Sequence, residues 1–462
     1  MTIVPAAGVT FEIEVPVAIV GGGACGLTAA LSAREASVDA LVIERDPLPS
    51  GSTALSAGLI PAAGTRFQAE KGVRDEPDLL VSDIQAKAKG RADPSVVAAV
   101  ARQSGPSIEW LADRHGIPFG LIEGFVYPGH SVLRMHGTPK RTGAELMGAL
   151  IGAAEAAGVD LMTDANVTRL YADDDGRITG LDVERPDGAL ERIGCRALIL
   201  ACNGYAGDSE LVRRHIPEMA DALYFGHPGN RGDAVRWGAA IGAGIRHMTA
   251  YQGHGSVAHP HGVLITWAVI TEGGIQVNAD GNRFANETTG YSEQAVPVLA
   301  QPGGFAWSVY AAPQDAVARQ FEDYRNAEAM GALKTADSVP GLERALALPP
   351  GSLAATLDGV ARMAGGVKTD PLGRAFDERP VLGPPYFAVK VTGALFHTQG
   401  GLVVDPMARV LRGDGTPLPN LFAGGGAACG VSGPDVDGYL SGNGLLSAVT
   451  LGRIAGRAAA TA

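Results

Sequence analysis

The sequence predicts an α/β fold in which both ends of the chain build one domain and the middle of the chain is inserted as a cap. Residues 15–46 combine an apolar run, a glycine turn, a helical stretch and a second apolar run, a pattern typical of one β-α-β unit. Apolar runs that end in glycine turns recur at residues 191–208 and 418–430. A further helical stretch follows the last of them, so the two chain ends share one pattern.

The middle of the chain has a different composition. Residues 250–396 are rich in Pro and Gly and contain helical patches such as 313–330, without a strand-glycine-helix signal. We therefore predict an α+β capping domain at 250–396. It lies between the first part (1–249) and the second part (397–462) of the other domain.

Length, charge and cysteine usage narrow the class of protein. A chain of 462 residues is long enough for two cores, and a net charge of −12 with a pI near 5.3 speaks against nucleic acid as a partner. No apolar stretch reaches about 18 residues and no signal-peptide pattern opens the sequence, so we expect neither a membrane span nor export.

A reducing cytoplasm is the expected compartment, because the four cysteines form no C-x-x-C pair; they are Cys25, Cys195, Cys202 and Cys429. His259 and His261 lack a third ligand at metal-binding spacing, so no metal is expected.

The glycine turn after the first strand is a dinucleotide-binding motif. GGGACG places Gly21, Gly23 and Gly26 in a G-x-G-x-x-G pattern, and Glu44 ends the next strand. Gly21 permits the tight turn, Gly23 lets the backbone approach a pyrophosphate, and Gly26 lets the helix pack on the strand. Glu44 can accept hydrogen bonds from a ribose. A chance turn in a Gly-rich chain is the alternative, but the strand and helix around the motif favour a Rossmann-like domain.

The segment PSGSTALSAG, residues 49–58, follows the acidic strand end with small side chains and hydroxyls. Such a segment suits a chain that passes a pyrophosphate and a flat ring system. A nicotinamide enzyme would not need it.

Eight segments together resemble the flavoprotein family of fumarate reductase, the succinate dehydrogenase flavin subunit and 3-ketosteroid delta-1 dehydrogenase. They occur in the family's order: GGGACGLTAALSA, ERD, GSTALSAG, LILACNGYAGD, GIQVNADGNRFANE, HTQGGLVVD, LPNLFAGGGAACG and GYLSGNGLLSA. The resemblance implies FAD in an interrupted Rossmann domain with a capping domain between its halves, and a diffusible electron acceptor, because no C-x-x-C-H haem motif is present. Residues 50–58 contain no histidine for attachment, so the FAD is expected to be non-covalent.

The resemblance also indicates which residues contact FAD. Beside the glycine motif they come from the acidic strand end, the hydroxyl-rich segment, the later strand ends and the last helix. The full set is Gly21, Gly23, Ala24, Cys25, Gly26, Glu44, Arg45, Ser52, Thr53, Ser56, Ala57, Gly58, Val167, Ala201, Cys202, Asn203, Gly204, Gly425, Asn443, Gly444, Leu445 and Leu446.

Two tyrosines stand where the family's reductases carry arginines. Tyr291 follows RF-x-NE, at the slot of the arginine that donates a proton to fumarate, and Tyr439 takes the slot of the arginine that binds a substrate carboxylate. The ketosteroid dehydrogenases are similar at both points. That resemblance implies that Tyr291 removes a proton alpha to a ketone, and that Tyr439, with a backbone N–H, hydrogen-bonds the ketone oxygen. A half-buried packing role is the alternative for any tyrosine.

The chemistry of ketone desaturation fits these roles. The alpha hydrogen leaves as a proton and flavin N5 takes the beta hydrogen as hydride, so negative charge develops on the carbonyl oxygen and a donor there stabilises the transition state. The N–H of Asn443 or Gly444 can assist Tyr439. A phenol has a pKa near about 10, so Tyr291 needs a partner to act as a base. Tyr127, in FVYPGH, is the candidate partner.

Two histidines follow the reductase pattern instead. His254 in YQGHGS, and His397 with Thr398 in FHTQGG, occupy positions where the reductases hold their substrate. A ketone with a polar or carboxylate group, such as an oxo-cyclohexane carboxylate, would fit this mixture, and a 3-ketosteroid is the other expected type.

The function expected from these residues is therefore an FAD-dependent dehydrogenase that introduces a C=C bond next to the ketone of a cyclic substrate. One alternative is a fumarate-reductase-like enzyme that saturates an activated alkene, with Tyr291 as the acid. Another is a flavin-binding protein without turnover, although such a protein would not need tyrosines at both catalytic slots.

Overall fold

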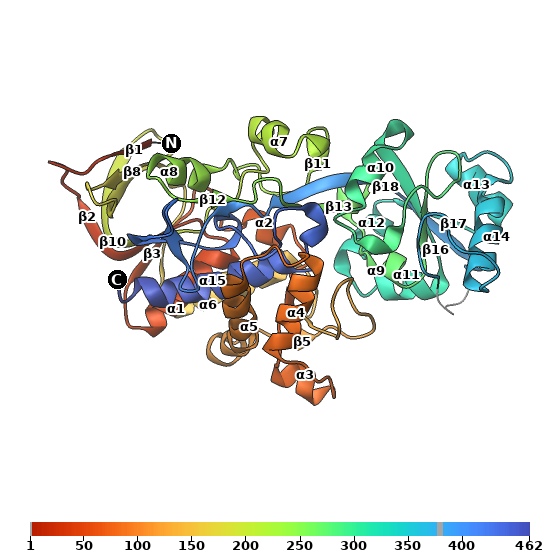
Figure 1. Cartoon of the computed structure of the whole chain (residues 1–462), viewed down its shortest axis with the longest axis horizontal. Helices are drawn as coiled ribbons and strands as arrows, with labels where there is room; N and C mark the ends of the chain where they lie inside the picture. The colour runs from red at the N-terminus through yellow and green to blue at the C-terminus, as the bar shows by residue number, and fades with distance from the viewer. Residues whose placement is uncertain (1, 377–381) are drawn as a thin grey trace.

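The computed structural model describes residues 2–376 and 382–462, and its larger sheet has five parallel strands at its centre, in the order β7-β3-β2-β10-β21 (Figure 1). β3 and the last four residues of β2, β10 and β21 are buried and almost wholly apolar, as parallel strands between helices usually are, whereas β7 at the edge is only partly buried. Val20 pairs with Ile43 on one side and Leu200 on the other, and Leu200 also pairs with Ala423. The glycine turns that follow β2, β10 and β21 therefore meet at one edge of the sheet. The strands are β2 (Ile13–Val20), β3 (Ala40–Ile43), β7 (Asp160–Met162), β10 (Leu190–Leu200) and β21 (Pro417–Ala423).

An antiparallel ribbon extends this sheet. β8 (Asn166–Ala172) pairs with β9 (Ile178–Glu184), β9 pairs with β10, β1 (Thr2–Pro5) joins β8, and β20 (Arg409–Leu411) joins β21.

Two helices from opposite chain ends cover one face of the sheet side by side. α1 (Ala24–Glu35) packs along α15 (Asn443–Ala459), where a methyl group at Gly456 would collide with the carbonyl oxygen of Ala29. Glycine thus permits a close approach between the two helices. This arrangement confirms the predicted β-α-β unit over residues 15–46 and the prediction that both chain ends enter one domain.

The remaining elements of this part lie around the same sheet. The helices are α2 (Gly51–Ala54), α3 (Arg66–Glu70), α4 (Pro77–Lys87), α5 (Pro94–His115), α6 (Gly143–Ala156), α7 (Ser209–His215) and α8 (Asp233–Ala240). Short strands are β4 (Ile60–Pro61), β5 (Gly120–Leu121), β6 (Met135–Gly137), β12 (Ile245–Arg246) and β19 (Gly401–Leu402). Within the described residues, no helix combines the length and apolar character needed to cross a bilayer.

A second, seven-stranded sheet is organised around one long strand, β18 (Tyr386–Thr398), which pairs with four others (Figure 1, right). The other strands are β11 (Leu223–Tyr224), β13 (Tyr251–Ala258), β14 (Val263–Leu264), β15 (Ile275–Val277), β16 (Phe305–Ala311) and β17 (Leu333–Ala336). The helices around it are α9 (Ala268–Thr271), α10 (Ala295–Leu299), α11 (Ala312–Ala318), α12 (Glu322–Ala329), α13 (Val339–Leu346) and α14 (Ser352–Ala364). The helical stretch expected at 313–330 is thus two helices, because Phe321 takes an extended conformation before α12.

The second sheet is joined to the first part of the molecule by the ends of its central strands. β18 runs towards the larger domain and ends at Thr398, opposite Tyr251 at the start of β13. We keep 250–396 as the proposed extent of the cap; β11 adds a strand from before residue 250 to its sheet.

Candidate active site

Two cavities lie where the glycine turns of the larger sheet meet the second sheet. The first, of about 810 Å³ with its open mouth included, is lined by the glycine turn after β2 and the end of β3; we call it the glycine-loop cavity. The second, of about 1310 Å³ with its mouth included, is lined by Tyr127, Tyr291 and Tyr439; we call it the tyrosine cavity. Six residues line both cavities, which are therefore adjoining parts of one elongated site: Ser52, Thr53, Asn203, Gly425, Gly426 and Ala448.

The N-terminus of α1 opens into the glycine-loop cavity, where the Thr53 hydroxyl accepts a hydrogen bond from the Ala24 N–H at 3.3 Å. Its N-cap residue, Gly23, makes no side-chain capping bond, and no acidic residue lies in the first turn. A methyl group at Gly23 would meet only the Thr53 hydroxyl, 3.7 Å away, whereas one at Gly26 would collide with the carbonyl oxygen of Gly21. Gly23 thus leaves room for a ligand and Gly26 lets the helix pack. Free N–H groups at a helix N-terminus favour a phosphate.

Glu44 lies at the end of β3 and lines the same cavity. One carboxylate oxygen accepts a hydrogen bond from the Gly22 N–H at 2.7 Å, and the other accepts from the Asp46 N–H at 3.1 Å. These bonds fix the carboxylate beside the helix N-terminus, where its remaining lone pairs can accept ribose hydroxyls.

Most of the predicted cofactor residues line one cavity or the other. Four do not: Gly26, Gly204, Asn443 and Leu446 lie behind the lining. A methyl group at Gly204 would collide with the Thr398 hydroxyl, Asn443 donates to the Ser432 hydroxyl at 3.1 Å, and Leu446 is fully buried. On the cavity wall, Trp237 presents an indole N–H that has no partner among the described residues. Sequence reasoning had not selected Trp237, Asn230 or Asp233, which follow no recognised motif.

The residues present fit FAD. The helix N-terminus and Glu44 suit the adenosine diphosphate part, and the adjoining tyrosine cavity, with Ala57, Leu445 and Ala448 in its wall, offers an apolar space for a flat ring.

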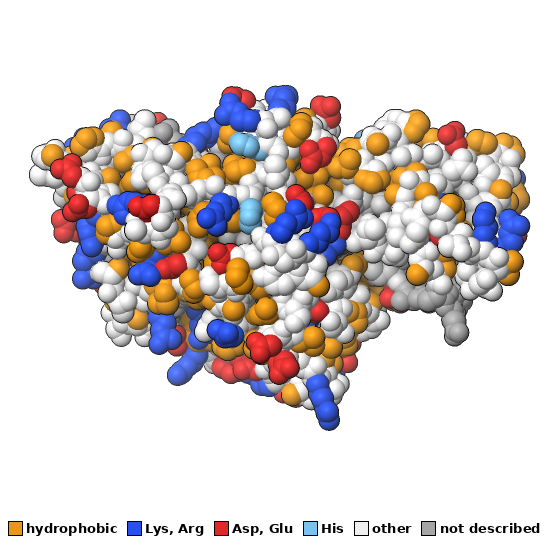
Figure 2. Space-filling view, viewed as in Figure 1, with side chains coloured by type: hydrophobic (Ala, Val, Ile, Leu, Met, Phe, Trp, Pro, Cys, Tyr) orange, Lys and Arg blue, Asp and Glu red, His pale blue; other side chains and the backbone are white. Residues whose placement is uncertain are grey.

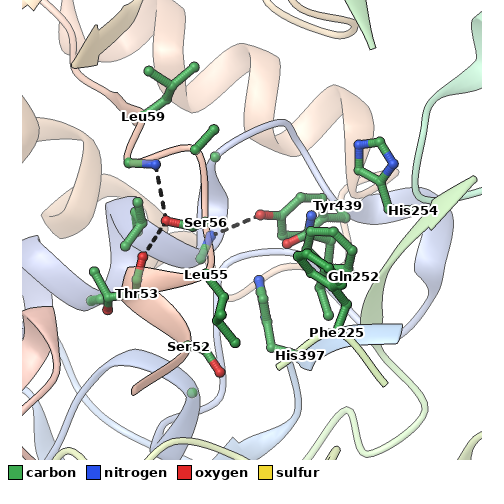
Figure 3. A pocket seen from close by; sticks show the side chains of 18 of the residues that line it. Ser52, Thr53, Leu55, Ser56, Leu59, Phe225, Gln252, His254, His397 and Tyr439 are labelled. Atoms are coloured by element: carbon green, nitrogen blue, oxygen red, sulfur yellow. Dashed lines mark hydrogen bonds between the residues drawn. The ribbon is translucent and has the colours of Figure 1, made fainter. Parts of the chain in front are cut away.

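Tyr291 and Tyr439 meet in the tyrosine cavity although they come from different parts of the chain. Their rings are 6.2 Å apart in an edge-to-face arrangement, and both side chains are buried. The phenolic oxygen of Tyr439 accepts a hydrogen bond from the Gly444 N–H at 3.3 Å (Figure 3). Gly444 lies in the first turn of α15, so the hydroxyl of Tyr439 points at the positive end of a helix.

Burial keeps the three tyrosines of the cavity protonated. It raises the pKa of Tyr291 to about 12, against the opposing effect of hydrogen bonds from the Ser441 hydroxyl and the Gly442 N–H. Burial also raises the pKa of Tyr439 well above its ordinary value. The pKa of Tyr127 is likewise raised by burial, and further by the nearby Tyr291. All three are therefore phenols at neutral pH.

His254 packs behind Tyr291 as a neutral aromatic ring. Its ring stacks on Tyr291 at 4.7 Å and on Phe396 at 5.2 Å, and its Nδ1 accepts from the Ser256 N–H at 3.1 Å. Burial lowers its pKa to about 3.

His397 lies beside Tyr439 with its ring 5.7 Å away (Figure 3). Nδ1 of its ring lies 3.0 Å from the Gln399 side-chain nitrogen and 3.4 Å from the Thr398 carbonyl oxygen, so these contacts fit a proton on either ring nitrogen. Burial lowers the pKa of His397 to about 4, so the ring is neutral. Thr398 is fully buried and accepts from the Tyr205 N–H at 3.2 Å.

The tyrosine cavity has little charge of its own. Among the described residues that line it, none is Lys or Arg, and the only carboxylate is Asp323. Sequence reasoning missed Asp323, Trp267 and Gln252, since none of them adjoins a recognisable motif. Ser441 lies within GYLSGNG and could have been selected by its position two residues after Tyr439. In the described part of the chain, no group of three or more His, Cys, Asp or Glu is placed to hold a metal.

Comparison with known proteins agrees with this geometry. A probable fumarate reductase of Shewanella frigidimarina is 30% identical over 96% of this chain and 74% of that protein. A 4-oxocyclohexanecarboxylate 2-dehydrogenase of Sinomonas cyclohexanicum is 26% identical over 96% of this chain and 92% of that protein. The structure of a 3-ketosteroid-delta4-(5alpha)-dehydrogenase from Rhodococcus jostii, in complex with 4-androstene-3,17-dione, superposes with a TM-score of 0.77 at 25% identity and covers 98% of both chains.

The family model described as the FAD binding domain matches residues 16–444. The resemblance, the α/β fold and the FAD cofactor predicted from the sequence are confirmed. The chain belongs to the FAD binding domain family, and it is an FAD-dependent oxidoreductase of the fumarate reductase family.

Proposed function

We propose that this oxidoreductase introduces a C=C bond alpha,beta to the ketone of a cyclic substrate. The observation that carries the proposal is the pairing of two buried phenols, Tyr291 and Tyr439, at the N-terminus of α15, in a cavity without Lys or Arg among its described lining residues. Fumarate, with two carboxylates, would find no cationic side chain on this lining.

Tyr439 and Gly444 form the site for the carbonyl oxygen. Because its pKa is raised by burial, the Tyr439 hydroxyl keeps its proton and can donate it in a hydrogen bond. The Gly444 N–H donates to the Tyr439 oxygen, and a ketone oxygen bound at this point would take over that N–H as a second donor. The negative charge that develops on the oxygen during enolisation is thereby stabilised by two donors and a helix N-terminus.

Tyr291 removes the alpha proton in this account. Its ring is stacked on His254 and lies edge-to-face against Tyr439. With a pKa of about 12, Tyr291 acts as a base when a partner relays its proton, and we assign this relay to the hydroxyls of Tyr127 and Ser441. FAD, when bound, supplies the acceptor for the beta hydrogen and its electron pair. His397 lines the same cavity beside Tyr439 and offers a ring nitrogen for a further hydrogen bond to the substrate.

One observation favours a second candidate, reduction of an activated alkene. The three phenols of the cavity are protonated at neutral pH, so Tyr291 starts as an acid rather than as a base. The same residues would then deliver a proton to the alpha carbon. The redox potential of the electron partner decides between the directions.

The test is the variant Tyr291→Phe in the FAD-loaded protein, with Tyr386→Phe as a matched control, because Tyr386 is a buried cap tyrosine that does not line the cavity. We expect Y291F to retain FAD and to lose about 100-fold or more in the rate of flavin reduction by a cyclic ketone. Y386F should keep the wild-type rate. Equal rates in all three proteins would remove Tyr291 from the mechanism.

We also propose that the FAD is held without a covalent bond. Ser52 lies among the residues that line both cavities, and its hydroxyl accepts from the Asn230 side chain at 2.8 Å. His227 lines the glycine-loop cavity, but its Nε2 is paired with Asp46 at 2.9 Å. Acid precipitation should release all the flavin into the supernatant, and yellow colour in the pellet would contradict this.

A further inference from the structure

Among the described residues of the cap, Asp323 is the one charged side chain that lines the tyrosine cavity. It is the second residue of α12, and it lines the cavity together with the adjacent Phe321. Leu264 and Thr266, in and just after β14, line the same cavity, and α12 packs against β14. Asp323 therefore belongs to the cap side of the cavity, whereas Tyr439 and Gly444 belong to the side formed by α15.

The carboxylate of Asp323 has no protein partner. In the parts of the chain that the structure describes, it makes no hydrogen bond and no ion pair. Its acidic neighbours do have partners: Asp315 pairs with Arg319 at 2.6 Å, and Glu328 pairs with the same arginine. A half-buried carboxylate without a partner is an acceptor that a ligand can satisfy.

The charge of the cavity wall therefore comes from this residue. Burial raises the pKa of Asp323 to about 6, with a smaller contribution from the charge of Glu322, so the side chain is mostly ionised at neutral pH. His254 and His397 are neutral and add no positive charge. Arg141 lies over the ring of Phe321, 5.5 Å from its centre, but it donates to Gln320 at 2.9 Å and is not among the lining residues.

We propose that the substrate is a cyclic ketone that carries a hydrogen-bond donor, a hydroxyl or an ammonium group, away from its carbonyl, and that Asp323 accepts this donor. A substrate carboxylate on the cap side would meet a like charge, and no described residue of the cavity wall is a cation, so the site selects against carboxylates. Asp323 is in this account the residue that determines substrate specificity. The inference rests on the proposed ketone desaturation and names its substrate class.

The test uses cyclohexanones that differ only in the group on the carbon opposite the carbonyl, attached directly or through a short methylene linker: methyl, hydroxyl, ammonium or carboxylate. The rate of anaerobic flavin reduction gives kcat/KM for each ketone. Hydrogen bonds to a charged group contribute about 1.5–3 kcal/mol, so we expect hydroxyl and ammonium compounds to exceed the methyl compound by about 10-fold to 100-fold. The kcat/KM of the carboxylate compound should be lower than that of the methyl compound.

Asp323→Asn is the decisive variant, and Glu322→Gln is its matched control. Both remove one negative charge from the start of α12, but Glu322 does not line the cavity. D323N should remove the preference for ammonium over carboxylate, while E322Q should retain it. Melting temperatures of both variants check that folding is unchanged.

The outcomes separate this inference from the proposed function. If the ketones reduce the flavin and the order of their rates is the same in wild type and D323N, the role of Asp323 is overturned and the proposed desaturation stands. The role of Asp323 would also be overturned if the carboxylate ketone reacted fastest and the variant Arg141→Gln slowed that reaction. Arg141 would then be the residue that recognises the substrate. Should no ketone reduce the flavin, the proposed function fails. In that case Asp323 can be tested without turnover. Phenols that carry the same groups in the para position are titrated into wild type and D323N, and their Kd values are measured from the change in the flavin spectrum.

Discussion

The backbone N–H of Gly444 donates a hydrogen bond to the phenolic oxygen of Tyr439, 3.3 Å away, at the first turn of α15. This bond holds the Tyr439 hydroxyl at the N-terminus of the helix, and the Gly444 N–H becomes a second donor when a ketone oxygen replaces Tyr439 as its acceptor. Donors positioned in this way stabilise a developing oxyanion.

Tyr439→Phe removes one of these donors and leaves the ring in place. We expect kcat for flavin reduction by a ketone to fall by about 100-fold to 1000-fold, the usual effect of losing an oxyanion donor, with a smaller change in KM. Stopped-flow measurement under anaerobic conditions gives both parameters. A change in KM alone would show that Tyr439 binds substrate and transition state equally well.

The pH dependence of the two directions should differ because burial raises the pKa of Tyr291 to about 12. Desaturation needs the deprotonated form, whose fraction grows about tenfold per pH unit below that pKa, so kcat/KM for the ketone should rise with pH. Reduction of an alkene needs the protonated form and should be nearly independent of pH between about 6 and 10. A flat profile for the ketone would mean that a partner with a lower pKa accepts the proton.

Ser441→Ala should make Tyr291 a weaker base. The Ser441 hydroxyl opposes the effect of burial on the pKa of Tyr291, so its loss should raise that pKa further. At constant pH the rate of ketone oxidation should fall by about tenfold or more, and the rising limb of the pH profile should move to higher pH. Ser82→Ala, an exposed serine on α4, is the control. A fall in rate without displacement of the profile would assign Ser441 a structural role only.

Two glycines of the loop should separate cofactor binding from folding. Gly23→Ala places a methyl group where only the Thr53 hydroxyl is near, so the fold should persist while the approach of a pyrophosphate is blocked. We expect the Kd for FAD to rise by at least about tenfold, equivalent to about 1.4 kcal/mol. Gly26→Ala collides with the carbonyl oxygen of Gly21 and should lower the melting temperature of the apoprotein itself. Equal effects of both substitutions on apoprotein stability would contradict this division of roles.

Acid should destabilise the protein through buried neutral histidines. Burial lowers the pKa of His254 to about 3 and the pKa values of His130, His136 and His397 to about 4, whereas an unfolded histidine titrates near about 6.5. Between these values the unfolded chain binds more protons, so the free energy of unfolding falls as pH falls from about 6.5 to about 4. The raised pKa of Asp323 acts in the opposite direction. Calorimetry near pH 5 should show net proton uptake on unfolding, and net release would contradict the assignment.

The sequence predicted the parts of the fold that depend on local patterns. The apolar run before Gly21, the helix from Ala24 and the strand that ends before Glu44 are contiguous in the chain, and their order alone predicts a β-α-β unit. The seven-stranded sheet of the cap was not predicted. Its central strand, β18, pairs with β13 and β16, which come from distant segments of the chain.

In the candidate site, too, the residues within sequence motifs could be predicted and those brought together by packing could not. Tyr291 and Tyr439 were selected through their motifs, and the structure places them on one cavity, where their catalytic roles remain a proposal. Asp323 and Trp267 reach that cavity only because the cap folds against the larger domain, and no local pattern marks them. Burial, which makes His254 and His397 neutral, likewise depends on packing that the sequence does not display.

The most direct test of the central claim is a single anaerobic turnover of the FAD-loaded protein with a panel of saturated cyclic ketones. Flavin absorbance and the mass of the product are followed together. Our account predicts that at least one ketone bleaches the flavin and yields an equivalent amount of the enone, two hydrogen atoms lighter. Absence of bleaching by every ketone, together with reoxidation of the pre-reduced protein by an enone or an unsaturated acid, would contradict desaturation and establish a reductase.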